Sequence, residues 1–227
     1  MQIVLSSGCS AAISEYLQVY AEMDHSGGLT DMPTYLVTYW EVYKADRPDN
    51  NKVFTRFRDV NFSHLYLDSG VFSARKLGQR IPVDRLINCY HQNSDVVRYV
   101  FSMDEGSHEQ QLENARYMHA AGVPVIPIYH ASMPLDYIDR FAEFTDYIAL
   151  GTIEAGWFYA GIRAKKYMNN VFSYIHRRGL WPLKIHALGC ESVPTLETFP
   201  FYSSDASSFV VEASRVENST WDNKKIG

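Results

Sequence analysis

Short apolar runs recur along the chain at intervals of roughly 25 to 35 residues, and each has the length and composition of a β-strand. Segments with the spacing of an amphipathic helix lie between most of these runs. The expected strands are 2–5, 34–39, 64–68, 97–104, 123–130, 146–151, 183–189 and 201–205. The clearest expected helices are 82–93, 107–122, 134–144 and 160–179.

Residues that begin and end helices support these boundaries. Pro82 is a plausible first helical residue, and Ser107 is a candidate N-cap with Gln110 three positions later. Gly122 and Gly179 follow the last periodic residues of their segments and are typical helix stops. Residues 43–61 are polar and irregular, which indicates a long loop with a short helix, and the chain from about 217 reads as a loose tail.

Strands that alternate with helices predict parallel βαβ crossovers. Eight such units in one chain predict an α/β fold, a compact (β/α)8 TIM-type barrel. A doubly wound open sheet is the alternative. No low-complexity linker divides the sequence, so we expect residues 1–227 to form a single domain.

Composition indicates a globular protein and argues against a membrane-spanning or secreted one. Hydrophobic residues make up 46% and charged residues 21% of the 227, as in ordinary globular proteins. No apolar run reaches the ~18 residues that a membrane span needs, and MQIVLSSGCS lacks the basic start of a signal peptide. The three cysteines, Cys9, Cys89 and Cys190, are scattered, which fits a reduced, cytoplasmic protein. A net charge of -5 means that nucleic-acid binding would need a local basic patch.

Polar residues stand where the expected strands end. Asp68, Asp104, His130 and Asp205 each close an apolar run. In a parallel barrel these positions open onto one face, where active sites are built. Two carboxylates there can act at an anomeric carbon, one as nucleophile and one moving a proton. The alternative is structural, with Asp68 capping a turn and Asp205 capping a final helix.

The other residues near these strand ends also have two interpretations. His130 can be a ligand, a base, a hydrogen-bond donor or a structural histidine. Gly151 can make a tight turn, or it can let a flat ligand approach backbone amides. Because His130, His186, Cys190 and the acids show no ligand spacing, we expect no metal.

Two basic clusters follow expected strands and would lie near the same face. Solvated helix surface is the usual explanation for such clusters, but together they would also suit a phosphate backbone. The two clusters are Arg75, Lys76 and Arg80, and Arg163, Lys165 and Lys166.

Five motifs, in order, resemble the tRNA-guanine transglycosylases and their relatives in bacterial islands and phages, the 7-deazaguanine DNA transglycosylases. They are LYLDSGVFSA, FSMDEGSHEQQLENARYM, IPIYHAS, YIALGTIEAG and HALGCESVPTLETFPFYSSDASSF. The resemblance covers most of the chain after about residue 63 and implies that Asp205 is the nucleophile and Asp68 the general acid/base. It also implies a base-binding role for Ser69, Gly70, Phe72, Asp104, His130, Leu150 and Gly151.

The sequence departs from this family in three ways. The family's zinc site, three cysteines and a histidine, has no counterpart, which again predicts no metal. Val71 replaces a glycine and His130 replaces a glutamine, and both changes bear on which base is preferred. The chain is also far shorter than the tRNA enzymes, which favours DNA over tRNA as the partner.

The resemblance therefore implies an enzyme that replaces guanine in DNA with a free 7-deazaguanine base, such as 7-cyano-7-deazaguanine, and needs no cofactor. The alternatives are the same exchange on tRNA, a nucleoside or N-glycoside hydrolase, and a base-binding barrel without turnover.

Overall fold

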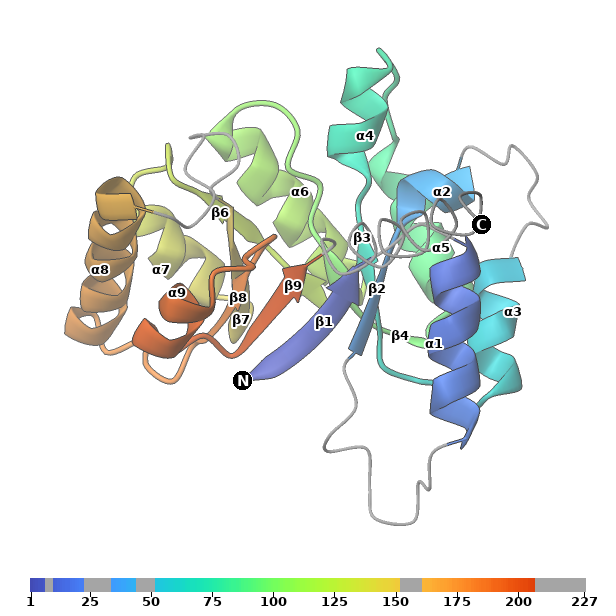
Figure 1. The fold of residues 1–227 in the computed structure, drawn as a ribbon. Helices are drawn as coiled ribbons and strands as arrows, with labels where there is room; N and C mark the ends of the chain where they lie inside the picture. The colour runs from blue at the N-terminus through green and yellow to red at the C-terminus, as the bar shows by residue number, and fades with distance from the viewer. Residues whose placement is uncertain (7–9, 23–33, 44–51, 152–160, 207–227) are drawn as a thin grey trace, which may run out of the picture.

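The computed structural model describes residues 1–6, 10–22, 34–43, 52–151 and 161–206 of the protein, and these form a ring of parallel strands surrounded by helices (Figure 1). The strands are β1 (Gln2–Ser6), β2 (Thr34–Thr38), β3 (Leu65–Asp68), β4 (Val97–Phe101), β5 (Val125–Ile126), β6 (Ile128–His130), β7 (Tyr147–Gly151), β8 (Lys184–Ala187) and β9 (Ser203–Ala206). The helices are α1 (Ser10–Glu22), α2 (Tyr39–Tyr43), α3 (Lys52–Asp59), α4 (Val71–Lys76), α5 (Val83–Gln92), α6 (His108–Ala120), α7 (Asp136–Ala142), α8 (Gly161–Arg177) and α9 (Val193–Thr198).

The sheet closes almost completely into a barrel. The strand order among the described residues is β5-β4-β3-β2-β1-β9-β8-β7-β6, and every pairing is parallel. The two end strands, β5 and β6, are separated in sequence only by Pro127, whose carbonyl accepts from the amide of Ala149 on β7 (2.8 Å). One continuous stretch therefore pairs with β4 through its first half and with β7 through its second half. The predicted (β/α)8 barrel is confirmed, and an open doubly wound sheet is excluded.

All eight expected strands are present, with shifted boundaries. The expected strand 123–130 is divided into β5 and β6 at Pro127, which has no N–H to give to a neighbouring strand. The expected strand 97–104 ends earlier, at Phe101. The region 43–61 contains α3, the expected short helix, while residues 44–51 and the tail from 217 lie outside the described residues.

The helix boundaries follow the expected residues closely. Ser107 caps α6, its hydroxyl accepting from the amide of Gln110 (3.2 Å). Pro82 is the residue before α5 rather than its first residue. Gly122 and Gly179 follow α6 and α8 with φ angles of 79° and 68°, which a residue with a side chain adopts only with strain.

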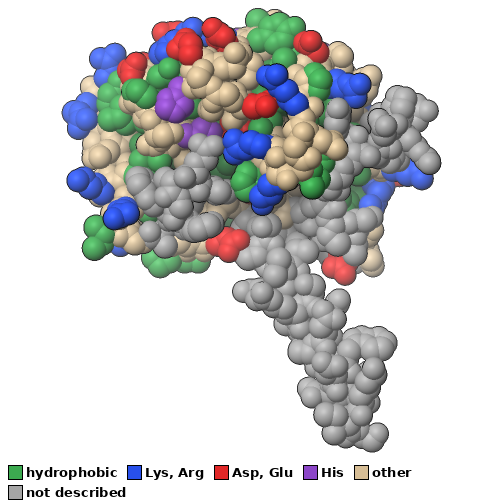
Figure 2. Space-filling view, turned by 90° about the horizontal axis from the view of Figure 1, so that it is seen from above, with side chains coloured by type: hydrophobic (Ala, Val, Ile, Leu, Met, Phe, Trp, Pro, Cys, Tyr) green, Lys and Arg blue, Asp and Glu red, His purple; other side chains and the backbone are tan. Residues whose placement is uncertain are grey.

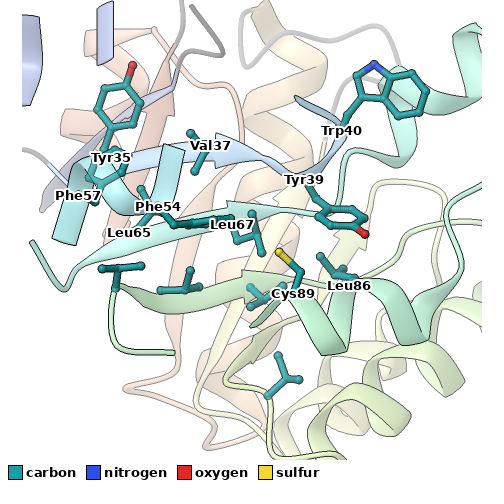
Figure 3. Close-up of a cluster of buried hydrophobic side chains, with 14 of the residues drawn as sticks. Tyr35, Val37, Tyr39, Trp40, Phe54, Phe57, Leu65, Leu67, Leu86 and Cys89 are labelled. Atoms are coloured by element: carbon teal, nitrogen blue, oxygen red, sulfur yellow. The ribbon is translucent and has the colours of Figure 1, made fainter. Parts of the chain in front are cut away.

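Side chains alternate between the barrel interior and the helix layer, as the pleat requires. Leu65 and Leu67 of β3 face outward and pack with Phe54 and Phe57 of α3 and other buried residues (Figure 3). Tyr66, between the two leucines, joins a separate interior cluster. This alternation decides which residues can reach the barrel mouth. Within the described part of the chain, no helix is long and apolar enough to cross a membrane.

Candidate active site

The carboxyl ends of the strands point to one end of the barrel, toward the top of Figure 1, and form its mouth. The structure brings Asp68, Asp104 and Asp205 together there. Asp104 and Asp205 are close enough to Asp68 for their charges to act on its carboxylate. His130 and Gly151 are paired across β6 and β7 at the same level. Four of the strand ends identified from the sequence thus converge on one site.

Asp68 ends β3 in a place that disfavours its charge. The residue is only partly exposed, and loss of hydration raises the pKa of its carboxyl group from 3.8 to about 6, with further increases from the nearby charges of Asp104 and Asp205. The hydroxyl of Thr38 and the amide of Gly70 act in the opposite direction, by stabilising the ionised form. A carboxyl group with this pKa can hold or release a proton near neutral pH, as a general acid/base must.

The Asp-Ser-Gly turn also has a structural function. The amide of Gly70 donates to Oδ2 of Asp68 (3.0 Å), so Asp68 does cap the turn before α4. Gly70 has φ 74°, and a Cβ there would lie 2.6 Å from the backbone nitrogen of Trp40. Ser69 is buried, and its hydroxyl lies 3.5 Å from the amide of Val71. The turn therefore holds Asp68 against β2 and α2, and the capping role accompanies its position at the mouth.

Asp205, on β9, is held through one oxygen atom. Its Oδ1 accepts from the amide of Gly189 (2.7 Å) and lies 3.0 Å from Nε2 of His186. Within the described ranges, the hydrogen bonds of the Asp205 side chain all involve Oδ1. The side chain is largely buried, with the residue 8% exposed. A carboxylate that is held through one oxygen can offer the other to a substrate, so the geometry of Asp205 suits a nucleophile.

His186 is a site residue that our sequence analysis considered only as a metal ligand. It is fully buried, and its second ring nitrogen, Nδ1, lies 2.6 Å from the hydroxyl of Ser203. Ser203 in turn hydrogen-bonds to the hydroxyl of Tyr147, which lies 3.4 Å from that of Tyr66. The available signal was the pleat, because Ser203 and Asp205 are two residues apart and share a face of β9.

Asp104 and His130 form a second polar pair in the mouth. Nε2 of His130 lies 3.3 Å from Oδ2 of Asp104, and His130 is only 4% exposed. A Cβ on Gly151 would lie 3.0 Å from Nδ1 of His130. The missing side chain of Gly151 thus makes room for the histidine ring. Glu105, the next residue, faces a different partner and pairs with Arg80 (3.3 Å).

Leu150 and Phe72 occupy different environments from each other. The side chain of Leu150 is fully buried in the layer between barrel and helices, so it can offer the mouth only backbone atoms. Its carbonyl accepts from the amide of Leu188 (3.2 Å). Phe72 lies on α4, which projects above the barrel in Figure 1, and is 47% exposed with Nζ of Lys76 4.1 Å from its ring centroid.

Both basic clusters lie on elements that begin at the mouth. All six side chains are exposed, and Figure 2, which looks down on this end of the molecule, shows Lys and Arg side chains interspersed with Asp and Glu. Arg75 and Lys76 are on α4 and Arg80 follows it. Arg163, Lys165 and Lys166 lie in the first two turns of α8, which follows β7.

No set of three or more His, Cys, Asp or Glu side chains in the described ranges could hold a metal ion. Cys190, near the mouth, is buried, and loss of hydration raises the pKa of its thiol to about 11. A thiol with this pKa stays protonated at neutral pH and is a poor nucleophile. The part of the motif YIALGTIEAG that follows Gly151 lies outside the described residues.

No family model matches the sequence, and no curated protein matches it. Among solved structures, the fold is similar to that of a proposed fructose-1,6-biphosphate aldolase from Coccidioides immitis, with a TM-score of 0.53 and 10% sequence identity. The match covers 91% of this chain and 73% of the other. At this identity the likeness establishes the barrel fold alone.

The arrangement supplies two carboxyl groups in different environments. Asp68 is poorly hydrated, lies near two other carboxylates and tends to hold a proton, because these surroundings raise its pKa to about 6. Asp205 is held through one oxygen by His186 and the amide of Gly189. The first environment suits a general acid/base, and the second suits a positioned nucleophile.

Proposed function

We propose that this protein is a base-exchange transglycosylase that replaces guanine in DNA with a free 7-deazaguanine through a covalent bond between Asp205 and the sugar. The observation that carries the proposal is the contrast between Asp68 and Asp205 at one barrel mouth. The five sequence motifs of the transglycosylases contain both residues and add the choice of base.

The first half-reaction breaks the bond to guanine. Oδ2 of Asp205 attacks C1′ of the nucleotide, which must leave the base stack to reach a barrel mouth. The C1′–N9 bond breaks, its electron pair stays on guanine, and the proton on Asp68 neutralises the departing base. The product is an ester of Asp205 with the sugar, and guanine is free to leave.

The second half-reaction reverses these steps with a different base. The Asp68 carboxylate takes the N9 proton of the incoming 7-deazaguanine, N9 bonds to C1′, and the Asp205 carboxylate leaves. Asp68 returns to its protonated form. Its pKa of about 6 suits both directions, because neither gaining nor losing the proton is costly near neutral pH.

Asp104 and His130 are the groups that we assign to the polar edge of the base. They lie beside each other, and Asp104 is close enough to Asp68 for its charge to act on the Asp68 carboxylate. Ser69, Gly70 and the backbone of Leu150 and Gly151 would shape the rest of the pocket, with the exposed ring of Phe72 available for stacking.

An incorporation assay tests the function. The protein is incubated with 7-cyano-7-deazaguanine and duplex DNA or, separately, tRNA, and the digested nucleosides are analysed by mass spectrometry. We expect a modified deoxynucleoside that is absent with Asp205→Ala. Asp146→Ala is the matched control, since Asp146 is an exposed aspartate that pairs with Lys184 at the opposite end of the barrel (2.8 Å). It should keep full activity.

Other outcomes of the incorporation assay would indicate a different function for the site. A modified ribonucleoside would keep the mechanism and change the partner to tRNA. Abasic sites without incorporation would identify a hydrolase that uses water as acceptor. The protein could also bind the free base, equally well in Asp205→Ala, and yield neither modified nucleosides nor abasic sites. That result would identify a base-binding barrel and refute the exchange.

The salt dependence of DNA binding tests the basic residues of α8. Each Lys–phosphate contact contributes about 0.9 to the slope of log affinity against log salt. Replacing Lys165 and Lys166 together with alanine should therefore lower the slope by about 2. Arg177→Ala, at the far end of the same helix, should leave it unchanged. An equal slope in all variants would show that these lysines of α8 do not contact DNA phosphates.

A further inference from the structure

We propose that His186 is a positioning residue that fixes the nucleophilic carboxylate, and that the buried hydroxyl groups of Ser203 and Tyr147 hold His186 in the Nε2–H tautomer that this requires. The catalytic consequence rests on the proposed function, whereas the tautomer can be tested without any activity. The chain of contacts runs from the mouth down into the barrel interior.

The hydrogen-bond partners determine the direction of each bond. An ionised Asp205 can only accept, so Nε2 of His186 must carry the proton at the 3.0 Å contact. Nδ1 of a neutral imidazole is then an acceptor, and Ser203 donates to it across 2.6 Å. The oxygen of Ser203 can accept at the same time from the hydroxyl of Tyr147. Every bond in the series thus points toward Asp205.

Tyr147 is suited to be the first hydrogen-bond donor in the series that ends at Asp205. It is buried in the barrel interior, and burial raises the pKa of its hydroxyl well above the ordinary value, so it stays a donor. Its ring is also packed edge-on against Tyr99 (5.2 Å between centroids) and Tyr202 (5.3 Å), which restricts its orientation. A fixed donor at one end and a carboxylate at the other leave His186 one favourable tautomer.

The geometry also distinguishes the two oxygen atoms of Asp205. His186 and the amide of Gly189 both engage Oδ1, one from the floor of the site and one from the loop after β8. Two donors on one oxygen fix the rotation of the carboxylate and leave Oδ2 for the substrate. Positioning of this kind matters because a displacement of about 1 Å in a reacting group can cost on the order of 100-fold in rate.

Histidine NMR tests the tautomer directly. In protein labelled with 15N-histidine, we expect the His186 signal at pH 7.5 to show a protonated Nε2 and an unprotonated Nδ1. The signal is assigned by its loss in His186→Gln, or by its selective shift in Ser203→Ala if the first variant does not fold. A protonated Nδ1, as the other tautomer or as imidazolium, would overturn the proposal.

Kinetics test the consequence for Asp205. His186→Leu should lower kcat on the order of 100-fold with little change in KM for the free base, because the base does not bind to His186. His186→Gln, which retains an N–H donor, should recover most of the loss. Equal losses in both variants, or a rise in KM with kcat unchanged, would contradict a positioning role.

A matched pair of tyrosine variants separates positioning from general stability. Tyr147→Phe and Tyr129→Phe each remove one buried hydroxyl, and Tyr129 donates to the carbonyl of Met133 (2.8 Å) in the helix layer, away from Asp205. Only Tyr147→Phe should lower kcat and perturb the His186 signal. If wild-type protein shows no exchange, the proposed function fails, yet the NMR result still decides the tautomer.

Discussion

Replacing Asp68 with asparagine should stabilise the protein at alkaline pH, although it removes a proposed catalytic group. Burial and the neighbouring carboxylates raise the pKa of Asp68 from 3.8 to about 6 in the folded protein. At about 1.36 kcal/mol per pKa unit, this corresponds to about 3 kcal/mol of unfolding free energy lost when the group is ionised. Asparagine keeps an oxygen to accept from Gly70 and carries no charge.

The pH dependence of this effect has a definite sign. Between pH 3.8 and about 6 the folded state binds more protons at Asp68 than the unfolded state does, so stability falls as pH rises through this range. Above pH 6 the full penalty is present in the wild type and absent in Asp68→Asn. The variant should therefore be more stable by up to about 3 kcal/mol at pH 8, and the gap should disappear near pH 4.

Urea denaturation at several pH values between 4 and 8, followed by tryptophan fluorescence, measures this gap. The same replacement at the exposed Asp59 of α3 is the control, and it should change stability by no more than about 0.5 kcal/mol at any pH. A gap for Asp68→Asn that does not vary with pH, or a variant less stable than the wild type at pH 8, would refute the raised pKa.

Two glycine replacements test the supports of the site. Gly70→Ala should cost at least about 2 kcal/mol in urea denaturation, because the added Cβ meets the backbone of Trp40 and the φ angle is strained, whereas Gly78→Ala, with a similar φ and open space, should cost about 1 kcal/mol. Equal costs for Gly70→Ala and Gly78→Ala would show that the contact with Trp40 does not contribute. Gly151→Ala should displace the His130 ring and weaken binding of the free base on the order of tenfold in calorimetry, and unchanged affinity would show that His130 does not contact the base.

Much of the site was visible in the sequence because strand ends are local features. Asp68, Asp104, His130 and Asp205 each follow an apolar run, and in a parallel barrel all such ends share one face. The structure confirms that these residues converge.

Other features depend on contacts between distant parts of the chain. The pleat places Ser203 and Asp205 on one face of β9, but only the register of β8 against β9 brings the ring of His186 to both. The ion pair of Arg80 with Glu105 is similar, since it joins residues from successive βα units.

The sequence by itself determined the alternation of strands and helices, the residues at the strand ends and the helix caps, because these depend on the pleat, the helical period and local hydrogen bonds. Only the tertiary structure decided that the sheet closes through the Pro127 segment, which pairs with β4 and β7 at once. It also decided the different environments of Asp68 and Asp205, since hydration and charge at a carboxyl group depend on everything folded around it.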